Sequence, residues 1–205
     1  MESTTVNDEA FNEIQTIETI KAAILTSKRK LMDDGVLLLT WGLAMSVSNF
    51  WNYYNAVNLT VWWMRNLMTA FQWVMGIVVI LLTAYFIFFR KNKVTSFTAI
   101  STRFVWIGVI LAHNIIVMIT KSILNDVNFT LLQPLQMVLI GFALFATGGI
   151  YRYWILTISG IAMWIAASIA ANYDLNIQFL IRSFSEFFCF VFPGFLMLQS
   201  KKEMK

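Results

Sequence analysis

The stretch NIQFLIRSFSEFFCFVFPGFLMLQ, residues 176–199, decides the fold of this chain. Its length and apolar composition predict a membrane-spanning helix, because about 20 apolar residues cross the hydrocarbon core of a bilayer. At 100° per residue, one side of this helix is formed by Gln178, Arg182, Glu186, Cys189 and Pro193. The opposite side is formed by Phe184, Phe187, Phe188, Val191 and Phe195. We expect the aromatic side to meet lipid and the polar side to face a protein bundle or a wet cavity.

Arg182 and Glu186 are opposite charges placed inside this apolar run. A charge near the bilayer centre costs roughly 2.5 to 3.5 kcal/mol on insertion scales, so each of these side chains needs a partner. Two interpretations are open, a structural pair that neutralises itself and a site on a ligand or ion pathway. Arg followed by Glu four residues later is the weaker order for a pair within one helix. We therefore expect partners for both charges on other helices.

The composition is that of a membrane protein. Of the 205 residues, 59% are hydrophobic and 13% are charged, whereas soluble domains have about 25% charged residues. With one Cys and one His, the chain has no spacing for a disulfide, a metal site or haem ligation. Motifs of hydrolases, metalloproteases and nucleotide-binding enzymes are missing from the sequence. We expect no enzyme, no catalytic residue and no cofactor, and the net charge of +4 indicates membrane topology rather than nucleic acid.

Three segments organise the chain, which we predict to be an all-α polytopic membrane protein. They are an N-terminal cytoplasmic amphipathic helix in residues 1–35, a six-helix transmembrane domain in residues 36–200, and a basic cytoplasmic tail in residues 201–205. The predicted spans are Val36–Tyr54, Leu67–Phe89, Phe104–Thr120, Leu131–Ile150, Tyr153–Ala171 and Ile177–Leu198. Similar Gly, Asn and Arg placements in alternate spans allow two interpretations, chance similarity between apolar helices and three repeated helical hairpins.

The N-terminal helix is apolar along one broad side. Apolar residues recur every three or four positions between residues 7 and 30, from Phe11 to Leu25. One interpretation is a helix that rests on cytoplasmic headgroups or on the bundle. The other is a docking helix for a partner protein or for a second copy of the chain, which would make a homo-oligomer.

Basic residues set the orientation of the six spans. Those on one side are Lys21, Lys28, Arg29, Lys30, Arg90, Lys91, Lys93, Arg103, Arg152, Lys201, Lys202 and Lys205. Those on the other side are Arg65, Lys121 and Arg182. Because cytoplasmic connections of membrane proteins are enriched in Lys and Arg, both termini are predicted to lie in the cytoplasm. We expect a multi-pass protein of the cell inner membrane.

Further candidate site residues lie outside the last span. His113 and Asn114 fall near the middle of the third span, and Lys121 and Arg65 lie towards the predicted outer side. With Arg182 and Glu186, they are predicted to line an outward-facing polar cavity. The open alternative for His113 is a ring held by an interhelical hydrogen bond.

Pro193 and Gly194 follow in the inner half of the last span. Proline removes a backbone hydrogen bond and glycine softens the next turn, which predicts a kink in this helix. A kink at this place is also a candidate gate.

Glycine and tryptophan placements give the chain a family resemblance. They are Trp41-Gly42, Gly148-Gly149, Gly160-Ile161-Ala162-Met163-Trp164 and Phe192-Pro193-Gly194. Across residues 30–200 the chain resembles a group of small, uncharacterised six-span proteins of the bacterial inner membrane, a resemblance that implies no activity. From the residues, we expect a membrane protein that binds or passes a small solute, ion or lipid. The alternative is a non-transporting membrane subunit or sensor that docks a partner through its N-terminal helix.

Overall fold

The computed structural model describes residues 15, 17–19, 35–58, 61–85, 97–124 and 128–203. One helix covers residues 35–57, and the helices that follow are α2 (Trp62–Ala84), α3 (Phe97–Leu124), α4 (Phe129–Tyr151), α5 (Trp154–Ala170), α6 (Leu175–Glu186), the π-helical η2 (Phe187–Val191) and α7 (Phe192–Glu203). Within these ranges the chain forms no β-strand. The all-α prediction is therefore confirmed.

Several helices have the length and composition of membrane spans. In the described part of the chain they are four, namely Trp62–Ala84, Ile100–Leu124, Phe129–Tyr151 and Leu175–Ser200. Helix α5 is apolar but shorter, with 17 residues, and the helix over residues 35–57 is not among the four. These helices indicate an integral membrane protein. Of the six predicted spans, four are supported by length and apolar composition.

For two of the spans, the predicted first residue lies several positions after the observed start of the helix. The second helix begins at Trp62 rather than Leu67, and the third begins at Phe97 rather than Phe104. Arg65 and Arg103 consequently lie inside helices instead of before them. A long basic side chain buries its apolar stem along the helix and extends its charged end to the interface, so these arginines do not end an apolar helix.

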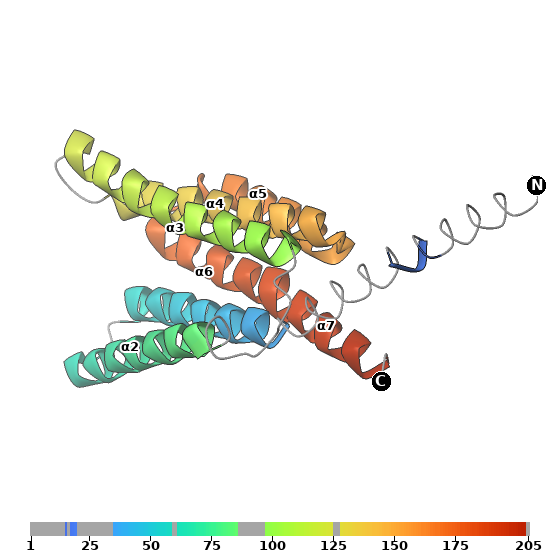
Figure 1. Ribbon diagram of the computed structural model, residues 1–205. Helices are drawn as coiled ribbons and strands as arrows, with labels where there is room; N and C mark the ends of the chain where they lie inside the picture. The colour runs from blue at the N-terminus through green and yellow to red at the C-terminus, as the bar shows by residue number, and fades with distance from the viewer. Residues whose placement is uncertain are drawn as a thin grey trace, which may run out of the picture.

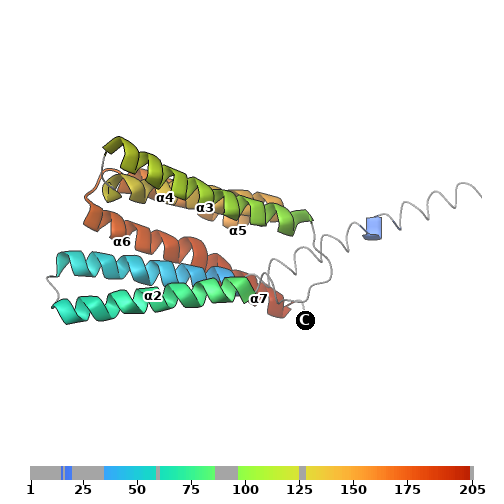
Figure 2. The ribbon, with the colours of Figure 1, turned by 60° about the vertical axis from the view of Figure 1, so that its left-hand side comes forward.

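The last helix, formed by α6, η2 and α7, lies in the middle of the molecule. Figures 1 and 2 show it between two groups of helices, with residues 35–57 and α2 on one side and α3, α4 and α5 on the other. On the second side α4 packs against both α3 and α5, and α6 contacts α4 and α5. Side chains of the last helix therefore reach both groups, which makes it the element that joins them.

The helix over residues 35–57 runs antiparallel to the last helix along its whole length. Gly35 lies against Gly194, and Gly42 lies against Phe190 one to two turns further along. A Cβ atom on Gly42 would stand 2.5 Å from the Cβ of Phe190, closer than two carbon atoms approach. Glycine at these crossings lets the two backbones come together, as is common in membrane helix pairs.

The predicted two-sided character of the last helix is confirmed. Gln178, Arg182, Glu186, Cys189 and Pro193 are buried, while Phe184, Phe187, Phe188 and Phe195 are exposed. The exception is Val191, which is predicted on the lipid side but is half-buried next to Gly42 of the neighbouring helix. The exposed side chains of α2 and α3 are also mainly hydrophobic. These exposed apolar faces are the ones that a bilayer would cover.

The irregularity in the last helix precedes the predicted kink. Residues Phe187–Val191 form wider π-helical turns, directly before Pro193 and Gly194. In a regular α-helix the Pro193 ring would clash with the carbonyl of Cys189, and the wider turns move that carbonyl. A gate at Pro193 and Gly194 stays a prediction.

The predicted amphipathic helix of residues 7–30 lies outside the described residues except at positions 15 and 17–19, which are helical and exposed.

Candidate functional site

Arg182 and Glu186 form a buried ion pair. The Nε of Arg182 lies 2.7 Å from Oε1 of Glu186, one helical turn away on the same helix. The Glu186 side chain is fully buried and that of Arg182 is 11% exposed. In such surroundings an isolated charge is costly, so each of the two side chains needs the other as its partner.

Both charges also have partners on other helices, as the sequence predicts. From α4, the side-chain oxygens of Gln133 and Gln136 accept hydrogen bonds from Nη1 of Arg182. From the helix over residues 35–57, Nδ2 of Asn49 donates to Oε2 of Glu186 over 2.7 Å. We call these five residues the polar network. It has no net charge, and it joins the two helix groups through the last helix.

A pair of serines lies next to the network. Oγ of Ser46 donates to the backbone carbonyl of Ser183 over 2.9 Å, and Oγ of Ser183 donates back to the carbonyl of Ser46 over 2.8 Å. Both hydroxyls are buried, and the exchange satisfies each of them. This reciprocal bond fixes the register of the two antiparallel helices at the level of the ion pair.

A pocket of about 380 Å³ opens at the predicted outer end of the same helices. It is lined by Asn52, Asn55, Ala56, Phe129, Leu175 and Phe179, and we call it the asparagine pocket. Three of the lining residues each lie three or four positions outward of a network residue: Asn52 of Asn49, Phe129 of Gln133, and Phe179 of Arg182. One α-helical turn rises about 5 Å, so the polar network lies roughly one turn below this pocket on all three helices.

A few buried side-chain atoms of the described residues have no hydrogen-bond partner. In the described part of the chain, such atoms are Nε1 of Trp51, Oγ1 of Thr147 and Oε1 of Gln178. Gln178 is fully buried and its Nε2 donates to the carbonyl of Tyr173 over 2.9 Å, which leaves its carbonyl oxygen unpaired. Most buried polar atoms in proteins are hydrogen-bonded, so this unpaired oxygen on the polar side of the last helix is an exception.

The other predicted site residues are not all brought to this place. His113 is half-buried on α3 and lies within electrostatic range of Arg182. Asn114 is exposed and donates to the carbonyl of Ile110 in its own helix. Arg65 and Lys121 are exposed, and no hydrogen bond or ion pair between described residues joins them to the network. The asparagine pocket is lined by none of the predicted site residues.

Pro193 and Gly194 lie further inward and are buried. Gly194 serves a close contact, since a Cβ there would stand 2.9 Å from the carbonyl oxygen of Gly35. The structure thus gives Gly194 a packing role at the crossing with the helix over residues 35–57.

The sequence analysis missed Asn49, Gln133 and Gln136. Gln133 and Gln136 are the two amide side chains of the mainly apolar α4 and lie on one face because they are three positions apart. Asn49 is one of three asparagines that recur every three positions in the helix over residues 35–57, with Asn52 and Asn55. Polar residues inside membrane helices generally face the bundle, so this pattern is the signal that identifies them.

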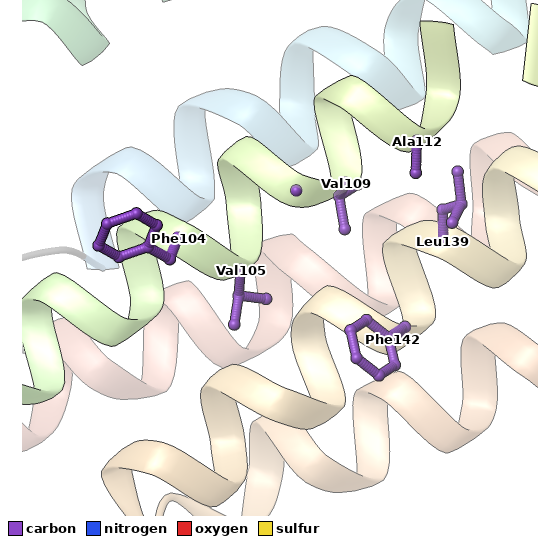
Figure 3. A pocket seen from close by; sticks show the side chains of 7 residues that line it. Phe104, Val105, Val109, Ala112, Leu139 and Phe142 are labelled. Atoms are coloured by element: carbon purple, nitrogen blue, oxygen red, sulfur yellow. The ribbon is translucent and has the colours of Figure 1, made fainter. Parts of the chain in front are cut away.

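A second cavity, of about 390 Å³, lies between α3 and α4. Figure 3 shows its lining, which is made by Phe104, Val105, Gly108, Val109, Ala112, Leu139 and Phe142. All of these residues are apolar, so this cavity has no group to orient a polar ligand.

Comparison of the chain with models of protein families, with curated proteins and with solved structures finds no match. The resemblance to a group of bacterial six-span proteins stays a prediction, and the function must be argued from the site itself.

Proposed function

We propose that this protein is a multi-pass protein of a bacterial inner membrane that binds a small solute in the asparagine pocket, with the polar network as the floor of the site. The observation that carries the proposal is the shared position of pocket and network. The same three helices supply both, and on each helix they are separated by one turn.

The pocket and the polar network below it differ in chemistry. The pocket offers two amide side chains among apolar ones, which is the usual make-up of a small-molecule site. Below it, the buried groups of the network bind one another and leave no net charge. A solute is therefore held above the network and does not pass it while these bonds are intact.

The topology in this proposal has six spans, with both termini in the cytoplasm. Four helices have the composition of spans, and the helix over residues 35–57 and α5 lie alongside them in the same bundle. The side that carries most Lys and Arg is assigned to the cytoplasm. This orientation directs the asparagine pocket outward, because Phe129 and Leu175 lie at the opposite end.

Cysteine accessibility tests the proposal without knowledge of the solute. In a Cys189→Ala background, single cysteines are placed at Ala56 in the pocket, at the buried Ser46 beside the network, and at Ala112 in the apolar cavity. Spheroplasts and inverted vesicles are treated with a membrane-impermeant maleimide. We expect Ala56→Cys to react in spheroplasts, and Ser46→Cys and Ala112→Cys to stay unlabelled, because the reagent needs water to reach the thiol.

Two results would contradict the proposal. Labelling of Ala56→Cys in inverted vesicles alone would show that the pocket faces the cytoplasm. Equal labelling rates for Ser46→Cys and Ala56→Cys in spheroplasts would show that the network does not close the site. The insertion of each variant is checked by its resistance to extraction with alkali.

A further inference from the structure

We propose that the apolar cavity between α3 and α4 holds one acyl chain of an anionic phospholipid, whose headgroup binds beyond the end of the cavity at Phe104. This site is separate from the asparagine pocket and does not depend on the proposed function. Four observations carry the inference, namely the lining of the cavity, its depth along the spans, its volume and the basic residues at one end.

The lining of the cavity admits hydrocarbon and offers nothing to a polar group. All of its lining residues are apolar. Figure 3 shows their side chains around the space between the two helices, with Phe104 at one end and Ala112 and Leu139 at the other. Phe104 and Phe142 are more than half exposed, so the cavity opens to the surface that a bilayer would cover. A polar ligand would lose its hydration there, whereas a lipid chain is already in hydrocarbon.

The cavity extends over the depth of one leaflet. On α3 its lining runs from Phe104 to Ala112, a rise of about 12 Å. The apolar span of α3 begins at Ile100, so the cavity starts about 6 Å inside this end of the span and ends about 18 Å inside it. Half of the hydrocarbon core of a bilayer is about 15 Å thick. An acyl chain that starts at the headgroups therefore passes along the cavity to the middle of the membrane.

The volume of the cavity suits a chain rather than a helix. The cavity measures about 390 Å³. An α-helix with its side chains is about 10 Å across, so about 12 Å of helix would fill roughly 900 Å³. A helix from a second copy of the protein would cover the opening without entering it. A single hydrocarbon chain is thin enough to enter.

A basic side chain lies beyond one end of the cavity. Only residues 125–128 separate α3 from α4, and the two helices pack side by side, so they run antiparallel (Figure 1). Phe97 at the start of α3 and Arg152 directly after α4 therefore lie at the same end, about 10 Å beyond Phe104 along the helix axis. Arg152 is exposed and forms no ion pair with another described residue. Arginine binds phosphate through two parallel N–H groups, so we assign the lipid phosphate to Arg152.

The sequence next to this end is also basic. Arg90, Lys91 and Lys93 shortly precede the first residue of α3. Lys and Arg beside a membrane span attract anionic headgroups. Together with Arg152, this charge favours an anionic phospholipid over a lipid without net charge.

Photochemical labelling tests the inference on the full chain. The protein is reconstituted in phosphatidylcholine nanodiscs that contain a phosphatidylglycerol with a diazirine in its acyl chain, and mass spectrometry locates the label after irradiation. Helix α2 is the internal reference, because its apolar side chains are also exposed. We expect at least five times more label on the cavity lining than on α2. The same diazirine chain on phosphatidylcholine should label the lining at least threefold less.

Matched glycines locate the acyl chain. Gly108→Leu fills the cavity, and Gly76→Leu places the same side chain on α2. At both positions no atom lies within 4 Å of an added Cβ, so both variants are expected to fold. Gly108→Leu should lower the label on the rest of the lining at least fivefold, and Gly76→Leu should leave it within twofold. Ala112→Leu fills the other end of the cavity and gives the same test independently.

Matched arginines locate the phosphate. At 100° per residue, Arg103 lies on the side of α3 opposite to the cavity lining. Arg103→Gln therefore removes one charge near the same end without touching the proposed site. We expect Arg152→Gln to lower the phosphatidylglycerol label at least threefold, and Arg103→Gln to leave it within twofold.

Four results would overturn the inference. Equal label on the lining and on α2 would mean ordinary contact with lipid and no held chain. A lining without label would mean that a second copy of the protein covers the cavity. Label that survives both Gly108→Leu and Ala112→Leu would place the chain elsewhere. Equal label from both headgroups, unchanged in Arg152→Gln, would contradict an anionic phospholipid as the ligand.

Discussion

Asn49 and Glu186 are 137 residues apart in the chain, yet Nδ2 of Asn49 lies 2.7 Å from Oε2 of Glu186. Arg182 occupies the other oxygen of the same carboxylate. Each oxygen of a buried carboxylate therefore has its own donor, one from its own helix and one from the helix over residues 35–57. This bond, with the exchanged bonds of Ser46 and Ser183, is the polar part of a helix pair that glycines bring together at its other end.

Replacing Asn49 by Leu should destabilise the protein. The variant leaves one oxygen of a buried carboxylate without a donor, and the loss of one partner of a charged group costs about 1.5 to 3 kcal/mol. Thermal unfolding in detergent measures the effect. Asn114→Leu is the matched control, because Asn114 is exposed and bonds only within its own helix. An equal loss in both variants would mean that the bond between Asn49 and Glu186 adds nothing to stability.

The ion pair should tolerate removal of both charges better than removal of one. Arg182→Ala leaves Glu186 buried without its counter-charge, and breaking such a pair costs about 3 to 5 kcal/mol. The double variant Arg182→Met with Glu186→Gln keeps the volume and leaves no unpaired charge. It should recover much of the lost thermal stability. Equal stability of the original protein and of both variants would show that no buried pair contributes.

The fold and the centre of the site follow from the sequence to different extents. The helices can be predicted from the sequence because a membrane span must be a long apolar segment. The polar face of the last helix can be predicted because Arg182 and Glu186 are four residues apart, which places them on the same side of a helix. The partners of these two charges cannot be predicted in this way, since Asn49 and Gln133 reach Glu186 and Arg182 only through tertiary packing. Asn114 has the same residue type as Asn49, but its side chain is exposed on the surface of the helix bundle. The residue type alone therefore does not tell whether a polar side chain in an apolar helix is buried or exposed. The arrangement of the helices decides this.

Whether a glycine lies at a helix crossing also depends on the arrangement of the helices. Gly42 and Gly76 both lie in apolar helices, but only Gly42 lies against another helix. A cavity needs even more tertiary detail, because the asparagine pocket takes its lining from three helices. Local pattern predicts the elements, and contact between distant residues makes the site.

The orientation predicts where reporter proteins become active. In the proposed topology, fusions placed before Met1 and after Lys205 should both report cytoplasm, because the side with most Lys and Arg residues is assigned to the cytoplasm. Alkaline phosphatase, which is active only outside the cytoplasm, and a fluorescent protein give opposite signals at each end. A fusion at Asn58, in the connection before α2, is the internal control and should report the outer side. A periplasmic signal from either terminus would contradict the six-span topology.

The N-terminal segment should not be needed for membrane insertion. Deletion of residues 1–27 should leave the bundle inserted, since the later helices carry enough apolar length to insert by themselves. Resistance of the truncated chain to alkaline extraction measures this. A chain that is released by alkali would show that the segment is an essential part of the bundle rather than a peripheral one.

Close packing of glycines gives the last prediction, with a matched pair of substitutions. Gly42→Ala places a methyl group 2.5 Å from the Cβ of Phe190, so one of the two helices must shift. Overpacking of this kind typically costs about 1 to 3 kcal/mol. Gly76→Ala is the control, because no atom lies within 4 Å of the added carbon. Alanine also favours the helix more than glycine does, by about 1 kcal/mol, so Gly76→Ala should be neutral or stabilising. Both are compared by thermal unfolding in detergent.

The same helix shift should also be seen at the polar network. Asn49 lies two turns beyond Gly42 on the same helix, so the shift in Gly42→Ala should move Asn49 away from Glu186. Because that bond holds the floor of the site, Gly42→Ala should raise the labelling rate of Ser46→Cys from the outer side, whereas Gly76→Ala should leave it unchanged. Similar behaviour of the two variants would mean that the helix over residues 35–57 does not pack on the last helix in the membrane.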